Sequence, residues 1–140
     1  MGPLDNVAEG YTHRTMGSNK KTVIISSIGT GSGMNVYRAL KKAFGDELYL
    51  VGTDADPSAA GLRLVDRAIT SPPLHSREQY ESFLFDMDYE LSPAVFLPCF
   101  SNEIEPVARL SQKLEAAGLR SFLPNVESVI TCDDKRVFAE

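Results

Sequence analysis

A glycine-rich segment is the clearest chemical signal in this sequence. It comprises Gly29, Thr30, Gly31, Ser32 and Gly33, and it follows a continuously apolar, β-branched run, residues 22–28. Glycines let a ligand approach the backbone closely, and the first turn of a following helix offers free N–H groups at the positive end of its dipole. The segment is therefore a candidate site for a phosphate or a carboxylate. A tight strand-to-helix turn without a ligand remains the alternative.

Two aspartates follow the second apolar run, residues 48–52. The carboxylates of Asp54 and Asp56 are suited to bind a substrate amine or a ribose hydroxyl. Turn formation and helix capping compete with this interpretation. For Asp56 they are the stronger explanation, because Pro57 follows it, as at the first position of a short helical turn.

Asn102 and Glu103 follow a third apolar run, residues 94–98. At a strand-to-helix junction both side chains are candidates to line the same crevice as the glycine segment. Helix capping alone also explains Asn102, since Glu105 completes a capping box with it.

Two nucleotide-binding motifs fail on inspection. The pattern G-x-G-x-x-G, started at Gly29, puts Met34 at its third glycine, and started at Gly31 it puts Val36 there. Asp54 does lie 23 residues past Gly31, near the distance expected for a ribose-binding acid. A module that binds NAD(P) or another dinucleotide therefore stays open as an alternative, whereas no Gly-Lys-Ser/Thr completes a phosphate-binding loop of the Walker type.

The histidines and cysteines indicate neither a metal site nor a nucleophilic triad. His13 falls in a segment without hydrophobic period, His75 follows two prolines, and Cys99 and Cys132 lie far apart. We expect both cysteines to be buried thiols in the reducing cytoplasm.

The chemistry-bearing segments must be positioned by alternating strands and helices. Strands are predicted over residues 22–28, 48–52, 67–70, 94–98 and 120–123, with helices or helical turns between them. Capping boxes begin two of the helices, at Ser76 and Asn102. The first helix is predicted to bury one apolar face, formed by Val36, Ala39, Leu40, Ala43 and Phe44. This alternation predicts an α/β, three-layer Rossmann-like domain with a mostly parallel sheet of about five strands. Ligands of such sheets bind beyond the carboxyl ends of the strands, where the strand order switches.

Composition is consistent with one domain that binds neither nucleic acid nor membrane. The chain has 140 residues, 43% of them hydrophobic, a formal net charge of −5 and no basic run. Residues 1–20 carry no hydrophobic period and are predicted to form a flexible tail. Beyond a short helical turn predicted at residues 126–130, Asp133 is predicted to begin a helix that has no C-cap, which favours a natural chain that continues.

Six segments in order resemble the N-terminal, pre-ATP-grasp domain of ATP-grasp ligases, in the branch that is similar to the large subunit of carbamoyl-phosphate synthase. They are residues 23–33, 51–57, 68–73, 97–103, 123–125 and 131–138. The resemblance implies a pre-ATP-grasp Rossmann-like domain over residues 21–131 and the start of a truncated ATP-grasp domain over residues 132–140.

Such ligases use ATP and Mg²⁺ to activate a carboxylate as an acyl phosphate, which an amine or a similar nucleophile then attacks. The resemblance implies that the glycine segment binds the acceptor substrate and that Lys135 contacts the nucleotide phosphates. A solvated lysine is the alternative for Lys135.

The resemblance also implies that ATP and Mg²⁺ bind lobes that follow in the natural chain. This segment alone is then expected to hold no cofactor and to be inactive, and its partners are a small-molecule substrate and the C-terminal ATP-grasp domain. A non-catalytic ligand-binding or self-associating domain stays open as a third hypothesis, with a homo-oligomer as a further partner.

Overall fold

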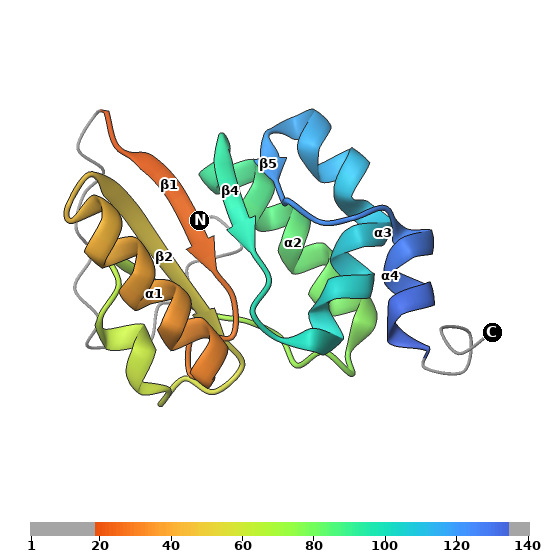
Figure 1. Ribbon diagram of the computed structural model, residues 1–140, viewed down its shortest axis with the longest axis horizontal. Coiled ribbons are helices and arrows are strands. Elements are labelled where there is room, and N and C mark those ends of the chain that lie inside the picture. The colour runs from red at the N-terminus through yellow and green to blue at the C-terminus, as the bar shows by residue number, and fades with distance from the viewer. Residues whose placement is uncertain (1–18, 135–140) are drawn as a thin grey trace.

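The computed structural model describes residues 19–134, which form a five-stranded sheet in the order β3-β2-β1-β4-β5 (Figure 1). All four neighbouring pairs are parallel. The strands are β1 (Lys21–Ile25), β2 (Leu48–Asp54), β3 (Arg67–Thr70), β4 (Ala94–Leu97) and β5 (Leu119–Arg120). The helices are α1 (Gly31–Phe44), the 3-10 helix η1 (Ala60–Arg63), α2 (Arg77–Leu91), α3 (Ser101–Ala117) and α4 (Val126–Asp133). The predicted α/β, Rossmann-like fold is confirmed.

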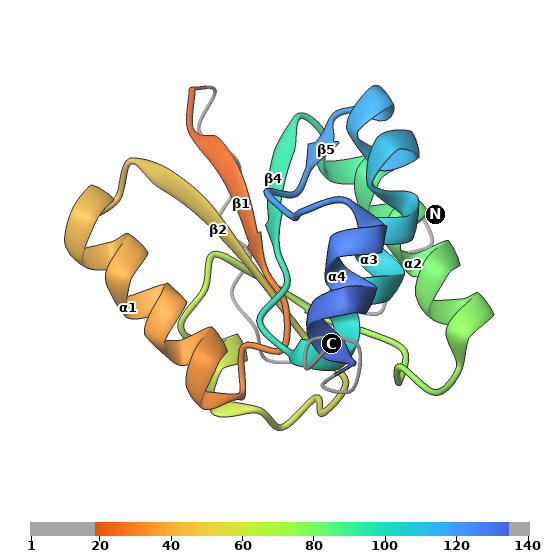
Figure 2. The ribbon, with the colours of Figure 1, turned by 45° about the vertical axis from the view of Figure 1, so that its right-hand side comes forward.

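The two faces of the sheet are covered by different helices. Ile24 belongs to a core with α2 and α3, whereas its neighbour Ile25 packs under α1 and η1. A strand buried in this way on both faces explains why residues 22–25 form a continuous apolar run. We call these the α2/α3 face and the α1 face; Figures 1 and 2 show α1 separated by the sheet from α2 and α3.

Helix α2 buries the apolar stripe expected from its spacing. The buried residues include Tyr80, Phe83, Leu84, Met87 and Leu91. Consecutive members are three, one, three and four residues apart, so they fall on the one side of the helix that faces the sheet. The predicted stripe is confirmed.

Helix α1 is far more exposed than its sequence predicts. Within the predicted apolar face, Val36 and Leu40 are half-buried, whereas Ala39, Ala43 and Phe44 are exposed. The prediction of one buried face is wrong for these three residues, because α1 packs only with the part of the core formed by β1–β3 and η1.

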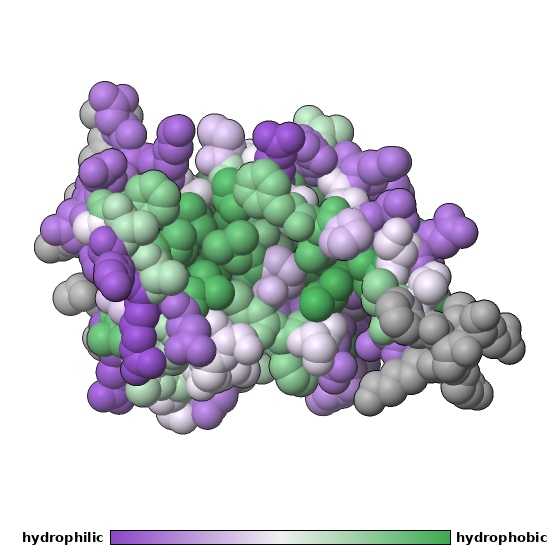
Figure 3. All heavy atoms as spheres, in the orientation of Figure 1, coloured by the Kyte–Doolittle hydropathy of each residue, from purple (hydrophilic) through white to green (hydrophobic). Residues whose placement is uncertain are grey.

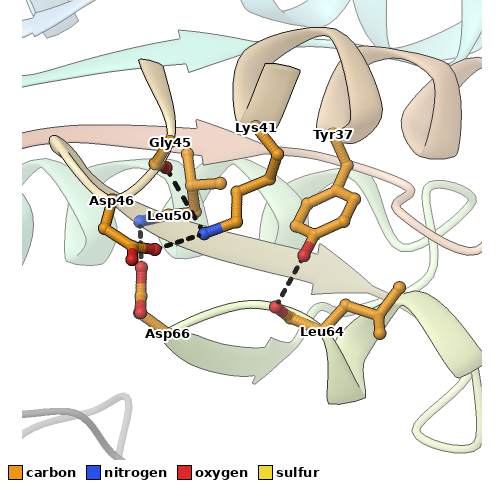
Figure 4. A network of polar contacts seen from close by, with 7 residues as sticks. All are labelled: Tyr37, Lys41, Gly45, Asp46, Leu50, Leu64 and Asp66. Carbon is orange, nitrogen blue, oxygen red and sulfur yellow. Dashed lines mark hydrogen bonds and ion pairs between the residues drawn. The ribbon is translucent and has the colours of Figure 1, made fainter. Parts of the chain in front are cut away.

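Polar contacts hold the carboxyl-terminal half of α1 (Figure 4). The Tyr37 hydroxyl donates to the Leu64 carbonyl at 3.1 Å, and the Lys41 ammonium pairs with Asp46 at 2.8 Å. The hydrogen bond to Asp46 raises the pKa of Lys41 above its ordinary value. Gly45 ends the helix with a φ of 55°, a backbone conformation that favours glycine.

Both predicted capping boxes are wrong. Ser76 precedes α2, but its side chain makes no capping hydrogen bond. Helix α3 starts at Ser101, so its N-cap is Phe100 and Asn102 lies inside the first turn. Glu105 pairs with Arg109 at 2.6 Å instead of closing a box.

Several element boundaries also differ from the prediction, including the ends of β2 at Asp54 and of β4 at Leu97. Strand β1 ends at Ile25 rather than residue 28, because Ser27 adopts a φ of 46° and turns the chain. Strand β5 covers Leu119–Arg120 rather than residues 120–123. The helical turn predicted at residues 126–130 is the start of α4, which runs to Asp133.

The predictions at the two ends of the chain fall mostly outside the described residues. Asp133 ends α4 rather than beginning a helix, and Asp134 is extended. Residues 1–18 and 135–140, which include most of the predicted tail and Lys135, lie outside the described part of the chain. Among residues 19–134, no helix combines the length and the apolar character needed to span a membrane.

Candidate functional site

The candidate site lies where the strand order switches, at the carboxyl ends of β1 and β4. These strands are neighbours, but the chain leaves β1 for α1 on one face and β4 for α3 on the other. Open α/β sheets bind ligands at such a switch point, because the two connections diverge there. The amino-terminal turns of α1 and α3 both start at this edge (Figure 2).

A capped turn joins β1 to α1. The Thr30 hydroxyl accepts the Gly33 N–H at 3.1 Å and donates to the Ser27 carbonyl at 2.7 Å. A Cβ on Gly33 would lie 2.5 Å from that carbonyl oxygen, so the helix start approaches the strand as closely as glycine permits. Gly33 and Thr30 therefore build the turn and do not need a ligand to explain them.

Only part of the glycine segment is left free for a ligand. The Gly29 N–H donates to Asp54 Oδ2 at 2.8 Å, and the Thr30 N–H donates to Ser27. Gly31 and Ser32 are exposed, and as the first residues of α1 their N–H groups have no acceptor within the helix. A Cβ on Gly31 would meet nothing within 4 Å, so packing does not explain this glycine.

The two predicted aspartates lie beside this turn. Asp54 ends β2, and its two carboxylate oxygens accept the N–H groups of Gly29 and Asp56, at 2.8 and 2.9 Å. Asp56 accepts both the N–H and the hydroxyl of Ser58, and these hydrogen bonds lower the pKa of Asp56. Asp56 thus caps a turn rather than a helix, since η1 begins only at Ala60.

Glu103 lies beneath the switch point rather than on its surface. Its carboxylate is 3% exposed and accepts the Ser26 hydroxyl at 2.5 Å and the Tyr80 hydroxyl at 2.8 Å. Burial raises the pKa of Glu103 above its ordinary value, although the hydroxyl hydrogen bonds oppose that shift. Burial and the nearby Glu103 also raise the pKa of Tyr80. This carboxylate ties β1, α2 and α3 together.

The two cysteines differ in exposure. Cys99 is half-buried, its N–H donates to the Ser26 hydroxyl at 2.9 Å, and burial followed by the charge of Glu103 raises its thiol pKa to about 11. Cys99 is therefore protonated and not nucleophilic at neutral pH. Cys132 is exposed, so the prediction of a buried thiol is wrong there.

Asn102 is placed on the surface at the start of α3. It is exposed together with Ser101, and the N–H groups of both precede the first hydrogen bonds of that helix. Ser101 also lines a pocket of about 300 Å³ between α3 and α4, with Ile104 and Cys132 among its other walls. Asn102 is thus free to contact a ligand, since it is not the cap of α3.

Taken together, the exposed groups at the switch point present donors to an anion and acceptors to a cation. The positive ends of α1 and α3 favour phosphate or carboxylate. Asp54 and Asp56 favour an amine or a hydroxyl. Within residues 19–134 no group of three or more His, Cys, Asp or Glu side chains is arranged to hold a metal ion.

Sequence reasoning missed the buried network under the site. Ser26, Tyr80 and Cys99 were not predicted as site residues, yet all three surround Glu103 or contact its partners. A weak signal was present, because Ser26 is a polar residue that directly follows the apolar residues of β1. No such signal was present for Tyr80, since its ring fits the apolar stripe of α2.

In comparisons with known proteins, no family model matches the chain and no curated protein matches it. What the site binds is therefore inferred from the groups that it presents.

Proposed function

We propose that this chain is the substrate-side, N-terminal domain of an ATP-dependent carboxylate–amine or carboxylate–thiol ligase of the ATP-grasp type. One observation carries the proposal: the N–H groups of Gly31 and Ser32 have no acceptor within α1, and Gly29, two residues before Gly31, donates its N–H to the Asp54 carboxylate. Donors and acceptors thus stand side by side at the switch point of a parallel sheet.

A substrate with both a carboxylate and an amine, such as an amino acid, fits these groups. Its carboxylate would accept the free N–H groups at the start of α1. Its ammonium would face Asp54, whose oxygens each accept one backbone N–H and keep further lone pairs. Asn102, exposed at the start of α3, would contact the remaining part of such a molecule.

The fold supports the resemblance to the ATP-grasp family. Four of the six segments that carry the resemblance reach the carboxyl ends of β1, β2, β3 and β4, and because all strands are parallel, these ends lie at one edge of the sheet. Segments that lay at both edges of the sheet could not form one site. Their common edge is therefore consistent with a single substrate site.

In this proposal ATP and Mg²⁺ bind further lobes of the ligase, as the resemblance implies. Lys135, the residue expected at the nucleotide phosphates, lies outside the described residues. The role proposed for this chain is to bind and orient the substrate. Alone, it should neither hydrolyse ATP nor form a ligated product.

The activity is tested by measuring ADP release. The natural polypeptide, including the sequence that follows Glu140, is incubated with ATP, Mg²⁺ and pools of amino acids and carboxylic acids. We expect ADP release that depends on one pool, and none from the 140-residue chain alone. The absence of stimulated turnover with every pool would count against a ligase.

The substrate site is tested by removing one N–H group. Gly31→Pro deletes the N–H at the first position of α1, where proline is favoured, and the preceding Thr30 already has the extended backbone (φ −80°, ψ 161°) that proline requires. Gly31→Ala keeps the N–H and is the matched control. We expect a roughly tenfold higher KM for the proline variant only.

A dinucleotide-binding module is the second candidate, favoured by the position of Asp54 at the end of β2 beside the glycine turn. It predicts saturable NAD(P) binding that Asp54→Ala weakens. Isothermal titration with NAD(P) separates the two, because the ligase proposal predicts no binding of either cofactor to this chain.

A further inference from the structure

The α1 face of the sheet carries a partly uncovered apolar strip over β1 and β4, in which Val23 is 8% exposed and Val95 and Leu97 are half-buried. In the strand register Val23 lies opposite Val95 and Ile25 opposite Leu97. Ile25 packs under α1, so Val23, Val95 and Leu97 point to the same face. Figure 3 shows apolar side chains exposed at the centre of this face, between α1 and the α3–α4 pair. We call these three residues, with Phe122, the open strip.

The fourth member of the strip is the most exposed. The Phe122 side chain is 69% exposed, and the Arg120 guanidinium lies 5.4 Å from the centre of its ring. Arg120 is paired in register with Val95, which places it on the α1 face as well. Parallel sheets are normally covered by helices on both faces. Among residues 19–134, however, no helix covers the strip.

Positive charge surrounds the open strip, although the whole chain is acidic. Lys20, Lys21 and Arg120 line a pocket of about 620 Å³ at its upper end, together with Val95 and a single carboxylate, Glu115, which pairs with Arg120 at 3.1 Å. Helix α1, along its other side, contains three basic residues and no acidic residue, and one of the three, Lys41, is paired with Asp46. The positive charge left on this face of a chain of net charge −5 therefore comes from Lys20, Lys21, Arg38 and Lys42. A complementary partner is apolar and acidic.

Helix α2 has those properties on its outer side. Phe85 is 40% exposed and Tyr89 is 88% exposed. Glu78 precedes Phe85 by seven residues and Tyr89 follows it by four, so all three lie on one side of the helix. The helix contains five acidic residues and one basic residue, but Asp88 is buried, Glu90 pairs with Arg67 and Glu81 pairs with Arg77, so among the described residues of this helix Glu78 and Asp86 carry the unpaired negative charge. We call Glu78, Phe85 and Tyr89, with Glu81, the α2 stripe.

We propose that the α2 stripe of one copy of this chain docks on the open strip of a second copy. The aromatic rings would cover Val95 and Phe122, and the carboxylates would face the ring of basic residues. Because the stripe and the strip lie on opposite sides of the sheet, the contact is head-to-tail rather than two-fold symmetric.

Sedimentation equilibrium of the full chain over a wide concentration range tests the contact. We expect reversible association. Lys21→Glu/Arg120→Glu in the strip, or Tyr89→Ser in the stripe, should weaken it at least about tenfold. All three side chains are exposed, so folding should survive, and circular dichroism checks this. Arg63→Glu, an exposed charge reversal on η1, is the control and should leave association unchanged.

Mixing the two defective variants separates this geometry from a symmetric dimer. The strip variant keeps an intact stripe, and the stripe variant keeps an intact strip, so an equimolar mixture should form dimers that grow no further. A symmetric interface gives no rescue on mixing and would overturn the proposal. A chain that stays monomeric at every concentration, or association that none of these variants weakens, would overturn it too.

Discussion

The two faces of the sheet are built to different degrees. On the α2/α3 face, fourteen buried residues form one core, which reaches from Ile69 on β3 to Leu119 on β5. On the α1 face the corresponding core has four buried residues, and α1 itself buries only Gly33. The chain thus concentrates its hydrophobic stabilisation on one face. The other face is left with the capped turn, the free N–H groups and the open strip.

The difference indicates that the α2/α3 face provides stability, whereas the groups at the carboxyl ends of β1 and β4 provide the proposed binding. The α2/α3 face and the buried Glu103 hold β1, α2 and α3 in place. That support fixes the carboxyl ends of β1 and β4, from which the binding groups project. A rigid base with exposed groups above it is the arrangement that precise binding needs.

Neighbouring residues on β4 give the largest expected contrast. Phe96 is 1% exposed and faces α2 and α3, whereas Leu97 is half-buried on the α1 face. Phe96→Ala should lower the free energy of unfolding by about 3–5 kcal/mol, and Leu97→Ala by only about 1 kcal/mol. Urea denaturation measures both. Equal losses would mean that the two faces contribute alike.

Removal of the buried carboxylate ranks second. Glu103→Ala leaves the hydroxyls of Ser26 and Tyr80 buried without their acceptor, which should cost about 2–4 kcal/mol of unfolding free energy. Glu103→Gln keeps an acceptor and should cost clearly less. If alanine and glutamine cost the same, the hydroxyl network is not what holds the three elements together.

Two glycines of one segment should respond in opposite directions. Gly33→Ala forces a Cβ to within 2.5 Å of the Ser27 carbonyl oxygen and should destabilise the protein by about 2 kcal/mol. Gly31→Ala meets open space in a helical position and should stabilise it by about 0.5 kcal/mol. Thermal unfolding of both variants measures the two changes in stability. If Gly31→Ala destabilises the protein as much as Gly33→Ala, Gly31 is required for packing.

The smallest expected effect is a pH dependence. The pKa of Glu103 is raised in the folded state, so the folded protein binds more protons than the unfolded chain above the ordinary glutamate pKa. Stability from this group should therefore fall as pH rises from that value through the folded pKa. Glu103→Gln should flatten this part of the curve, as measured by urea denaturation at several pH values. An unchanged slope would assign the dependence to other groups.

Much of the fold could be predicted because its signals are local. The β-branched run of β1 and the apolar stripe of α2 each depend on residues that are close in the sequence. The site was only partly predictable. Ser26 and Glu103 are 77 residues apart, and only the pairing of β1 with β4 brings them together.

The exposure of α1 was not predictable for a related reason. Its apolar spacing is that of a buried helix, but how much is buried depends on which strands lie beneath it. The order β3-β2-β1-β4-β5 places α1 over β1 and its neighbours on one side only, which leaves Ala43 and Phe44 exposed. The N-cap predicted at Asn102 was wrong because α3 begins earlier, with Phe100 in an extended conformation as its N-cap.

The binding role of the switch point is tested most directly by the backbone amide resonances of the full chain. An ¹⁵N–¹H spectrum is recorded during titration with a pool of amino acids, for the wild type, Gly31→Ala and Gly31→Pro. We predict saturable shifts at Gly31, Ser32 and Asn102 in the wild type and in the alanine variant, with much weaker binding in the proline variant. Saturable shifts confined to residues away from the carboxyl ends of β1 and β4, or equal affinity in all three proteins, would contradict the account.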